Sequence, residues 1–136
     1  MPTPGFGDAA VDGAMLRHRH AVLNGVPKRY SFSRNPITSN IETLTRGKTL
    51  YEEHCTVCHG AHGLGDGELA ADLEIKPTDI SYIQLTTTSV AGFVYWAIAD
   101  GGEPIASPMP AFRDEMTSDE IWSVIHFMRN GFRATP

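Results

Sequence analysis

The chain has 136 residues, which is enough for one ordinary domain with its own core and too few for two. Hydrophobic residues make up 41% of the chain, and this excludes a disordered polymer. The formal net charge is −5, from 11 Lys and Arg against 16 Asp and Glu. This acidic balance argues against nucleic acid as a partner and suits a protein partner with a basic surface. A net charge of this size is also ordinary for a domain of this length.

The sequence contains no run of about 18 apolar residues, so we predict no transmembrane segment. The first residues have no basic region followed by an apolar region, and we therefore identify no signal peptide in this chain. A mature or recombinant form would have the same appearance, so this observation does not argue for the cytoplasm.

Residues 1–38 are rich in Gly and Pro and have no sustained hydrophobic period. Residues 15–23 can form a short helix that ends at Gly25, and residues 26–36 are typical of extended chain and turn. We expect an irregular extension that lies on a domain of residues 39–136, not a second domain.

A helix is predicted from Ser39 to about Cys55, because Ser39 and Glu42 have the spacing of a capping box. Four glycines then indicate an irregular loop: Gly60, Gly63, Gly65 and Gly67. A short helix over residues 68–73 is expected next, and Pro77 prevents its continuation.

Two more helices are predicted in the second half of the chain. The first has a possible cap at Thr87 or Thr88 and ends at Gly101, and the last opens with a capping box of Thr117 and Glu120. An extended loop between them contains three prolines: Pro104, Pro108 and Pro110. We find no internal repeat and no convincing strand, so the predicted fold class is all-α with long loops.

Cys55 and Cys58 are the two cysteines of the chain, and His59 follows them directly. This spacing is the pattern for haem attachment, because both thiols can form thioethers along one edge of a haem while the histidine binds the iron. A thioredoxin-like dithiol would require a βαβ context, and a structural zinc site would require two more ligands, such as His54 and His62. We therefore predict one covalent haem c whose iron is bound by His59.

The second iron ligand must come from a distant part of the sequence, since a carrier haem is normally held on both faces. The candidates are Met15, Met109, Met116, Met128, His18, His20 and His126. Met109 lies between Pro108 and Pro110, which stiffen the backbone around it and leave it little entropy to lose. We predict Met109 as the ligand, and core packing for Met116 and Met128.

Residues 41–132 resemble the class I c-type cytochrome family, in particular its bacterial monohaem domains. The resemblance is carried by Gly47–Tyr51, Cys55–Gly60, Gly63–Gly67, Ile98–Gly101, Met109–Phe112 and Trp122–Arg129. It implies a cytochrome c fold with three to five helices around one covalent haem, and it implies that His59 and Met109 are the axial pair.

The resemblance also implies contacts around the cofactor. Gly47 and Tyr51 are expected to meet the last helix near Phe127, and the carbonyl of Pro77 is expected to accept a hydrogen bond from His59. We expect apolar walls of the haem site to include Ile80, Ile98 and Phe112.

These features predict a single-electron carrier, not an enzyme, that shuttles between redox proteins of a respiratory or dehydrogenase chain. The covalent haem implies a periplasmic or otherwise extracytoplasmic location. Two alternatives stay open: a haem subunit fixed in a larger redox complex through residues 1–38, and a small-gas or peroxide site in which Met109 is displaceable. The sequence identifies neither the donor nor the acceptor.

Overall fold

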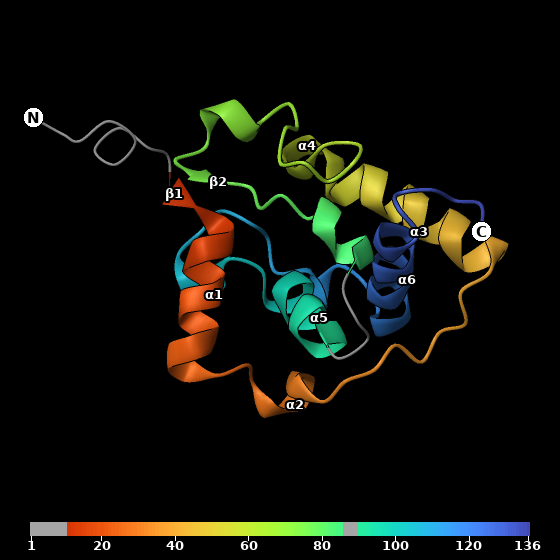
Figure 1. Cartoon of the computed structure of the whole chain (residues 1–136), viewed down its shortest axis with the longest axis horizontal. Helices are drawn as coiled ribbons and strands as arrows, with labels where there is room; N and C mark the ends of the chain where they lie inside the picture. The colour runs from red at the N-terminus through yellow and green to blue at the C-terminus, as the bar shows by residue number, and fades with distance from the viewer. Residues whose placement is uncertain (1–10, 86–89) are drawn as a thin grey trace, which may run out of the picture.

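The computed structural model describes residues 11–85 and 90–136, which form a set of short helices joined by long loops (Figure 1). In chain order the elements are β1 (Val11–Asp12), α1 (Gly13–Asn24), α2 (Lys28–Ser31), α3 (Ile41–His54), α4 (Thr56–His59), β2 (Ile75–Lys76), α5 (Ala91–Asp100) and α6 (Ser118–Arg129). Short 3-10 turns lie at Ala70–Asp72, Ser81–Leu85, Glu103–Ile105 and Phe112–Asp114. The predicted all-α class is confirmed, and the helix expected over residues 68–73 is the first of these turns.

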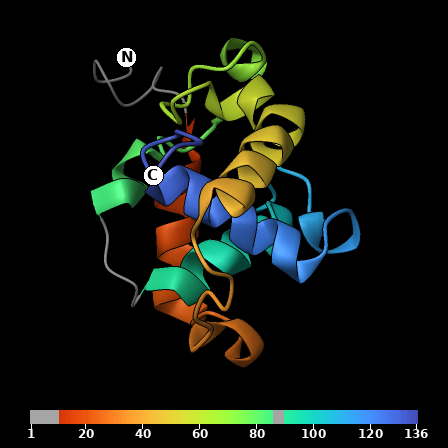
Figure 2. The same ribbon diagram turned by 90° about the vertical axis from the view of Figure 1, so that its right-hand side faces the viewer.

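Helices α3 and α6 cross and make the most extensive contact between two elements (Figure 2). The crossing is close because α3 presents Gly47 to α6. A Cβ atom at this position would lie 2.2 Å from the carbonyl oxygen of Ser123 and 2.9 Å from Cβ of Phe127. The predicted meeting of Gly47 with the last helix near Phe127 is thus confirmed.

The start of α3 differs by one residue from the prediction. Asn40, not Ser39, is the cap: its Oδ1 accepts from the amide of Thr43 at 2.9 Å, and Oγ1 of Thr43 accepts from the amide of Asn40 at 2.9 Å. The side chains of Asn40 and Thr43 can accept these hydrogen bonds as well as those of Ser39 and Glu42 can. The sequence therefore contains two overlapping candidate capping boxes.

The capping box of Thr117 and Glu120 at the start of α6 is confirmed. The cap predicted for α5 at Thr87 or Thr88 lies outside the described residues. The predicted end of α5 is confirmed, because the helix ends at Asp100 and the next residue, Gly101, has a φ of 60°.

The N-terminal extension is more regular than predicted. It contains α1, which ends at Gly25 as expected, and α2, which replaces part of the expected extended chain. Strand β1 pairs in parallel with β2, with Val11 opposite Ile75, and Figure 1 shows α1 continuing from this pair along one side of the molecule. A strand of two residues carries no period of its own, which explains why no strand was predicted.

The core is a cluster of buried side chains, most of them from α3, α5 and α6, with further members from α2 and from the loops. Aromatic rings link the elements: Tyr51 lies 5.5 Å from the ring of Phe127, and Tyr95 lies 4.6 Å from that of Trp122. Across residues 11–85 and 90–136, no helix has the length and apolar character needed to cross a membrane.

Candidate functional site

Cys55, Cys58 and His59 lie on a single helical turn where α3 passes into α4. The amides of Cys58 and His59 both donate to the carbonyl of Cys55, at 3.2 and 2.9 Å. Residues three apart on a helical turn share one side, so the two thiols are neighbours on the same face. Gly60 ends the turn directly after His59.

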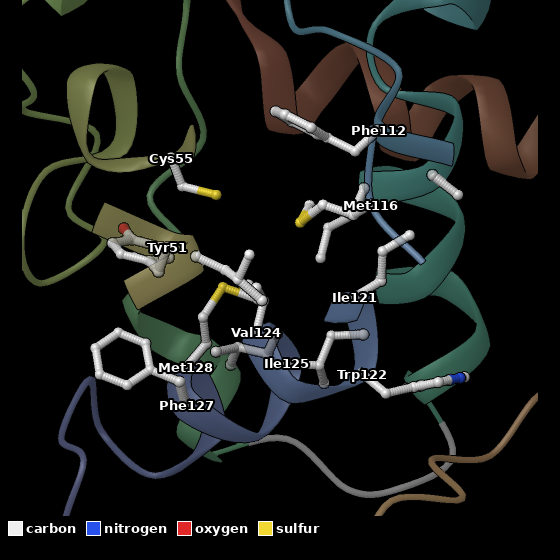
Figure 3. Close-up of a cluster of buried hydrophobic side chains, with 14 of the residues drawn as sticks. Tyr51, Cys55, Phe112, Met116, Ile121, Trp122, Val124, Ile125, Phe127 and Met128 are labelled. Carbon is white, nitrogen blue, oxygen red and sulfur yellow. The ribbon is translucent and has the colours of Figure 1, made fainter. Parts of the chain in front are cut away.

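The surroundings of both thiols favour the protonated form. Burial raises the pKa of Cys55 to about 12, with a further contribution from Cys58, and burial also raises the pKa of Cys58. A redox-active dithiol requires the opposite, a thiol whose pKa is lowered. Figure 3 shows the sulfur of Cys55 pointing into the buried cluster, toward Met116 and Phe112.

His59 is positioned by a backbone carbonyl on another segment. Its Nδ1 donates to the carbonyl oxygen of Thr78 at 2.9 Å, which leaves Nε2 as the free acceptor nitrogen. Burial is the largest cause that lowers the pKa of His59; the bond to Thr78 opposes this effect, and the charge of Arg17 adds to it. The neutral imidazole that results is the form that binds a metal ion.

The hydrogen bond expected from the carbonyl of Pro77 is made by the next residue instead. Successive carbonyls of an extended segment point in opposite directions, so only one of the two can face His59. The carbonyl oxygen of Pro77 faces Gly65, where it would lie 2.7 Å from a Cβ atom. Gly65 has a φ of 81°, so the loop needs glycine here both for its backbone angle and for its space.

Tyr51 connects the attachment turn to the core. Its buried hydroxyl donates to the carbonyl of Gly60 at 2.6 Å, and its ring packs against Phe127 and Phe132. Burial raises the pKa of Tyr51, so the hydroxyl keeps its proton. Its place in the structure is between the attachment turn and α6, where it fixes the turn to the core.

Met109 is half-buried in a closed loop between α5 and the turn at Phe112. The amide of Gly102 donates to the carbonyl of Met109 at 2.9 Å, and the amide of Ser107 donates to the carbonyl of Gly102 at 3.0 Å. These bonds join the two ends of the loop, so the position of Met109 depends on hydrogen bonds as well as on its flanking prolines.

The three predicted wall residues are all in the interior. Phe112 and Ile98 are buried, and Ile80 is half-buried against the same cluster. The ring of His54 lies 5.5 Å from that of Phe112, and His62 is exposed. Within the described residues, no three His, Cys, Asp or Glu side chains are grouped as a metal site, and the geometry gives the zinc alternative no support.

Two charged residues at this site were missed by the sequence analysis. Arg17, on α1, is buried and donates from Nη2 to the carbonyl of Gly101 at 2.8 Å. Asp100 is also buried and accepts from Tyr30 at 3.0 Å. A single Arg in a polar helix and an Asp before a Gly carry no signal of burial, so only the folded chain identifies them.

The donor set fits a covalently attached haem: two neighbouring thiols and a neutral imidazole with a free Nε2. Comparison with known proteins supports this interpretation. Residues 42–128 match the family described as cytochrome c oxidase, cbb3-type, subunit III. The match covers more than half of the chain, so the protein belongs to this family of c-type cytochrome domains.

Two relatives extend the comparison. A segment of 86 residues, 63% of this chain, is 27% identical to the cytochrome c subunit of an alcohol dehydrogenase (quinone) from Gluconobacter oxydans (strain 621H). The fold is similar to a chain of the reducing HAO-like protein complex of Kuenenia stuttgartiensis, with a TM-score of 0.60 and 30% identity over 74% of this chain. The chain spans only 18% of the first relative and 47% of the second.

The family and the two similarities support electron transfer through a c-type haem in a cytochrome c fold.

Proposed function

We propose that this protein transfers single electrons through one haem c that is covalently attached at Cys55 and Cys58, with His59 and Met109 as axial ligands. The observation that carries the proposal is the attachment turn, which combines two neighbouring thiols with an imidazole whose Nδ1 is bound by Thr78. A bond to Nδ1 presents Nε2 in one orientation and raises the basicity of the ring.

The haem iron supplies one-electron redox chemistry within the protein. His59 and Met109 would hold the haem iron, and a thioether ligand at Met109 would favour a higher potential than a second histidine. Cys55, Phe112 and Ile98 exclude water on the buried side. Because Cys58 is half-buried and Val57 is exposed, the thioether edge would lie near the surface, where a partner can approach.

Absorption spectroscopy of both oxidation states, with a pyridine assay for thioether-linked haem, tests this proposal. We expect one haem per chain, a low-spin six-coordinate spectrum in both states and a far-red band of thioether bound to ferric iron. A five-coordinate spectrum would contradict the carrier function and favour the small-gas or peroxide alternative.

The two similar proteins are components of multi-protein assemblies, which favours a fixed redox subunit as the second candidate function. Exposed apolar side chains on the extension offer a surface for docking: Phe32 is 90% exposed and Leu23 is 69% exposed. In this case the purified protein would carry stoichiometric partner chains, and the double variant Leu23→Ser, Phe32→Ser would lose them. Purification of the wild type as a single chain would instead favour the free shuttle.

We further propose that the chain works in the periplasm or another extracytoplasmic compartment, where covalent haem attachment takes place in bacteria. Its electron donor and acceptor would be redox proteins, with no nucleic acid partner. Expression with and without an export signal tests the compartment, because only exported protein is expected to carry the covalent pigment.

A further inference from the structure

Arg17 is a buried cation without a complete set of partners. The residue is 7% exposed, and its Nη2 is bound by the carbonyl of Gly101 at 2.8 Å, whereas its buried Nη1 has no hydrogen-bond partner. The guanidinium lies 5.1 Å from the ring centre of Trp96, whose buried Nε1 also lacks a partner. Two unpartnered donors in one buried place indicate a missing acceptor.

The charges around Arg17 lead to the same conclusion. Asp100 is a carboxylate whose charge acts on Arg17, but the oxygens of Asp100 already accept from Tyr30 and pair with Arg29 at 3.2 Å and Arg113 at 3.3 Å. Across residues 11–85 and 90–136, Arg17 forms no ion pair of its own. The missing acceptor is therefore an anion.

The position of Arg17 places that anion at the cofactor site. Its Nη2 lies 4.0 Å from Sδ of Met109. The helix that carries it is anchored to the same region, because β1 pairs with β2 shortly before Thr78, whose carbonyl binds His59. Arg17 therefore lies beside the proposed ligand Met109, on a helix anchored next to the segment that orients His59.

We propose that Nη1 of Arg17 binds a haem propionate, so that the N-terminal helix α1 completes the cofactor site. This inference rests on the proposed function, since the carboxylate belongs to the haem. Arg17 lies outside residues 42–128, the part of the chain that the family accounts for. The extension thus supplies a cofactor-binding residue and is not only a spacer or a docking arm.

The propionate accounts for all three observations together. It supplies an acceptor to Nη1, it neutralises a buried guanidinium, and it is the acidic part of the one cofactor that fits the attachment turn. Nε1 of Trp96 is a second donor for the same carboxylate group. A purely structural Arg17 would explain the bond to Gly101 but would leave Nη1 buried and unpaired.

The test compares three variants of the full chain purified with haem: Arg17→Gln, Arg17→Lys and the matched control Arg19→Gln. Arg19 lies on the same helix and is exposed. Two quantities are measured: the reduction potential, and the propionate bending mode in the resonance Raman spectrum, which responds to hydrogen bonding at the carboxylate.

Loss of the cation is expected to favour the more highly charged ferric state. Arg17→Gln should change the equilibrium constant for reduction about tenfold, a fall of about 59 mV for one electron, and should shift the propionate mode. Arg17→Lys should restore most of the potential because it restores the charge, but its propionate mode should still differ from that of the wild type, because an ammonium does not donate with the geometry of a guanidinium. Arg19→Gln should leave both quantities unchanged.

An unchanged propionate mode in both Arg17→Gln and Arg17→Lys would overturn the inference, whatever happens to the potential. If Arg17→Gln fails to assemble, an unchanged mode in Arg17→Lys alone has the same meaning, and a shifted mode supports the proposal. Wild-type protein without covalent haem would overturn the proposed function and this inference together. Normal haem with an unmoved propionate would overturn the inference alone.

Discussion

Met109 shows how two levels of constraint act on a single side chain. The sequence provides prolines on both sides, and the folded loop adds the bond between the amide of Gly102 and the carbonyl of Met109. Arg17 also lies 4.0 Å from its sulfur. A side chain held in this way loses little further freedom on binding a metal, so its substitution should affect the cofactor more than the fold.

Met109→Ala is therefore predicted to remove one iron ligand while leaving the haem attached. We expect the far-red thioether band to disappear and the reduction potential to fall by on the order of 0.1 V, within the roughly 0.8 V range set by axial ligands. Redox titration followed by absorption measures both effects.

Met116→Leu is the matched control. Met116 is buried in the core, and a change that conserves volume there costs less than about 1.5 kcal/mol and should leave the spectrum intact. A spectrum and potential that are unchanged in Met109→Ala would contradict ligation by Met109.

At the scale of elements, the contact between α3 and α6 fixes the attachment turn in place. The close approach depends on Gly47. The next turn of α3 carries Tyr51, whose hydroxyl donates to the carbonyl of Gly60, the residue after His59. Displacement of α3 would therefore move the haem attachment turn as well.

Gly47→Ala is predicted to destabilise the fold by about 1–3 kcal/mol, because its Cβ would lie 2.2 Å from the carbonyl oxygen of Ser123 and neither helix backbone can yield cheaply. The control Lys48→Ala changes an exposed position of the same helix and should stay within about 0.5 kcal/mol. Denaturant unfolding of the holoprotein compares the two. Equal stabilities would show that the helices tolerate a wider separation.

Glu120 gives a prediction for pH at the start of α6. Its carboxylate accepts from the amide of Thr117 at 2.9 Å, which is the largest cause that lowers the pKa of Glu120 below its ordinary value of 4.5. A carboxyl whose pKa is lower in the folded state adds stability above its unfolded pKa and loses it as the pH falls through the folded value.

The wild type should therefore be modestly more stable than Glu120→Gln at pH 7, and the difference should shrink as the pH falls below about 4.5. Thermal unfolding between pH 7 and pH 3.5 measures this trend. A difference that grows toward low pH would contradict the assignment of Glu120 to the capping box.

For the whole molecule, charge near the thioether edge is expected to select partners. A surface hollow of about 490 Å³ beside the attachment turn is bordered by Val57 and by three exposed acidic residues, Glu52, Asp66 and Glu68. A negative rim around the exposed edge should attract cationic partners and repel anionic ones.

The double variant Asp66→Asn, Glu68→Gln is predicted to slow electron transfer to hexaammineruthenium, a cation, severalfold at low salt and to speed transfer with ferricyanide, an anion. Both effects should fade at high ionic strength. The control Glu42→Gln, Asp119→Asn removes the same charge at the starts of α3 and α6. Identical behaviour of the two double variants, measured by stopped flow, would show that net charge alone matters.

An interaction could be predicted from the sequence when its residues lie close together along the chain. The attachment turn and the capping box of Thr117 are written in local patterns, and both were predicted from them. The close approach at Gly47 joins distant residues, and it was expected only from the family resemblance. The carbonyl that binds His59 was displaced from Pro77 to Thr78, because the orientation of a carbonyl depends on the path of the whole segment.

Contacts of the extension could not be predicted, since they join residues far apart in sequence. Arg17 and Gly101 are 84 residues apart, and neither has a sequence signal for the other. The pairing of β1 with β2 is too short to leave a hydrophobic period. The boundary between residues 38 and 39 stays a prediction, and the burial of Arg17 against the Met109 loop argues for one cooperative unit.

Covalent attachment of the pigment is the central claim, and extraction tests it most directly. The purified holoprotein is denatured and treated with acidified organic solvent, and the polypeptide is then examined for colour and for free thiols. We predict that the pigment stays with the polypeptide and that neither Cys55 nor Cys58 reacts with a thiol reagent. Pigment that passes into the solvent, or two reactive thiols in the denatured chain, would contradict the account.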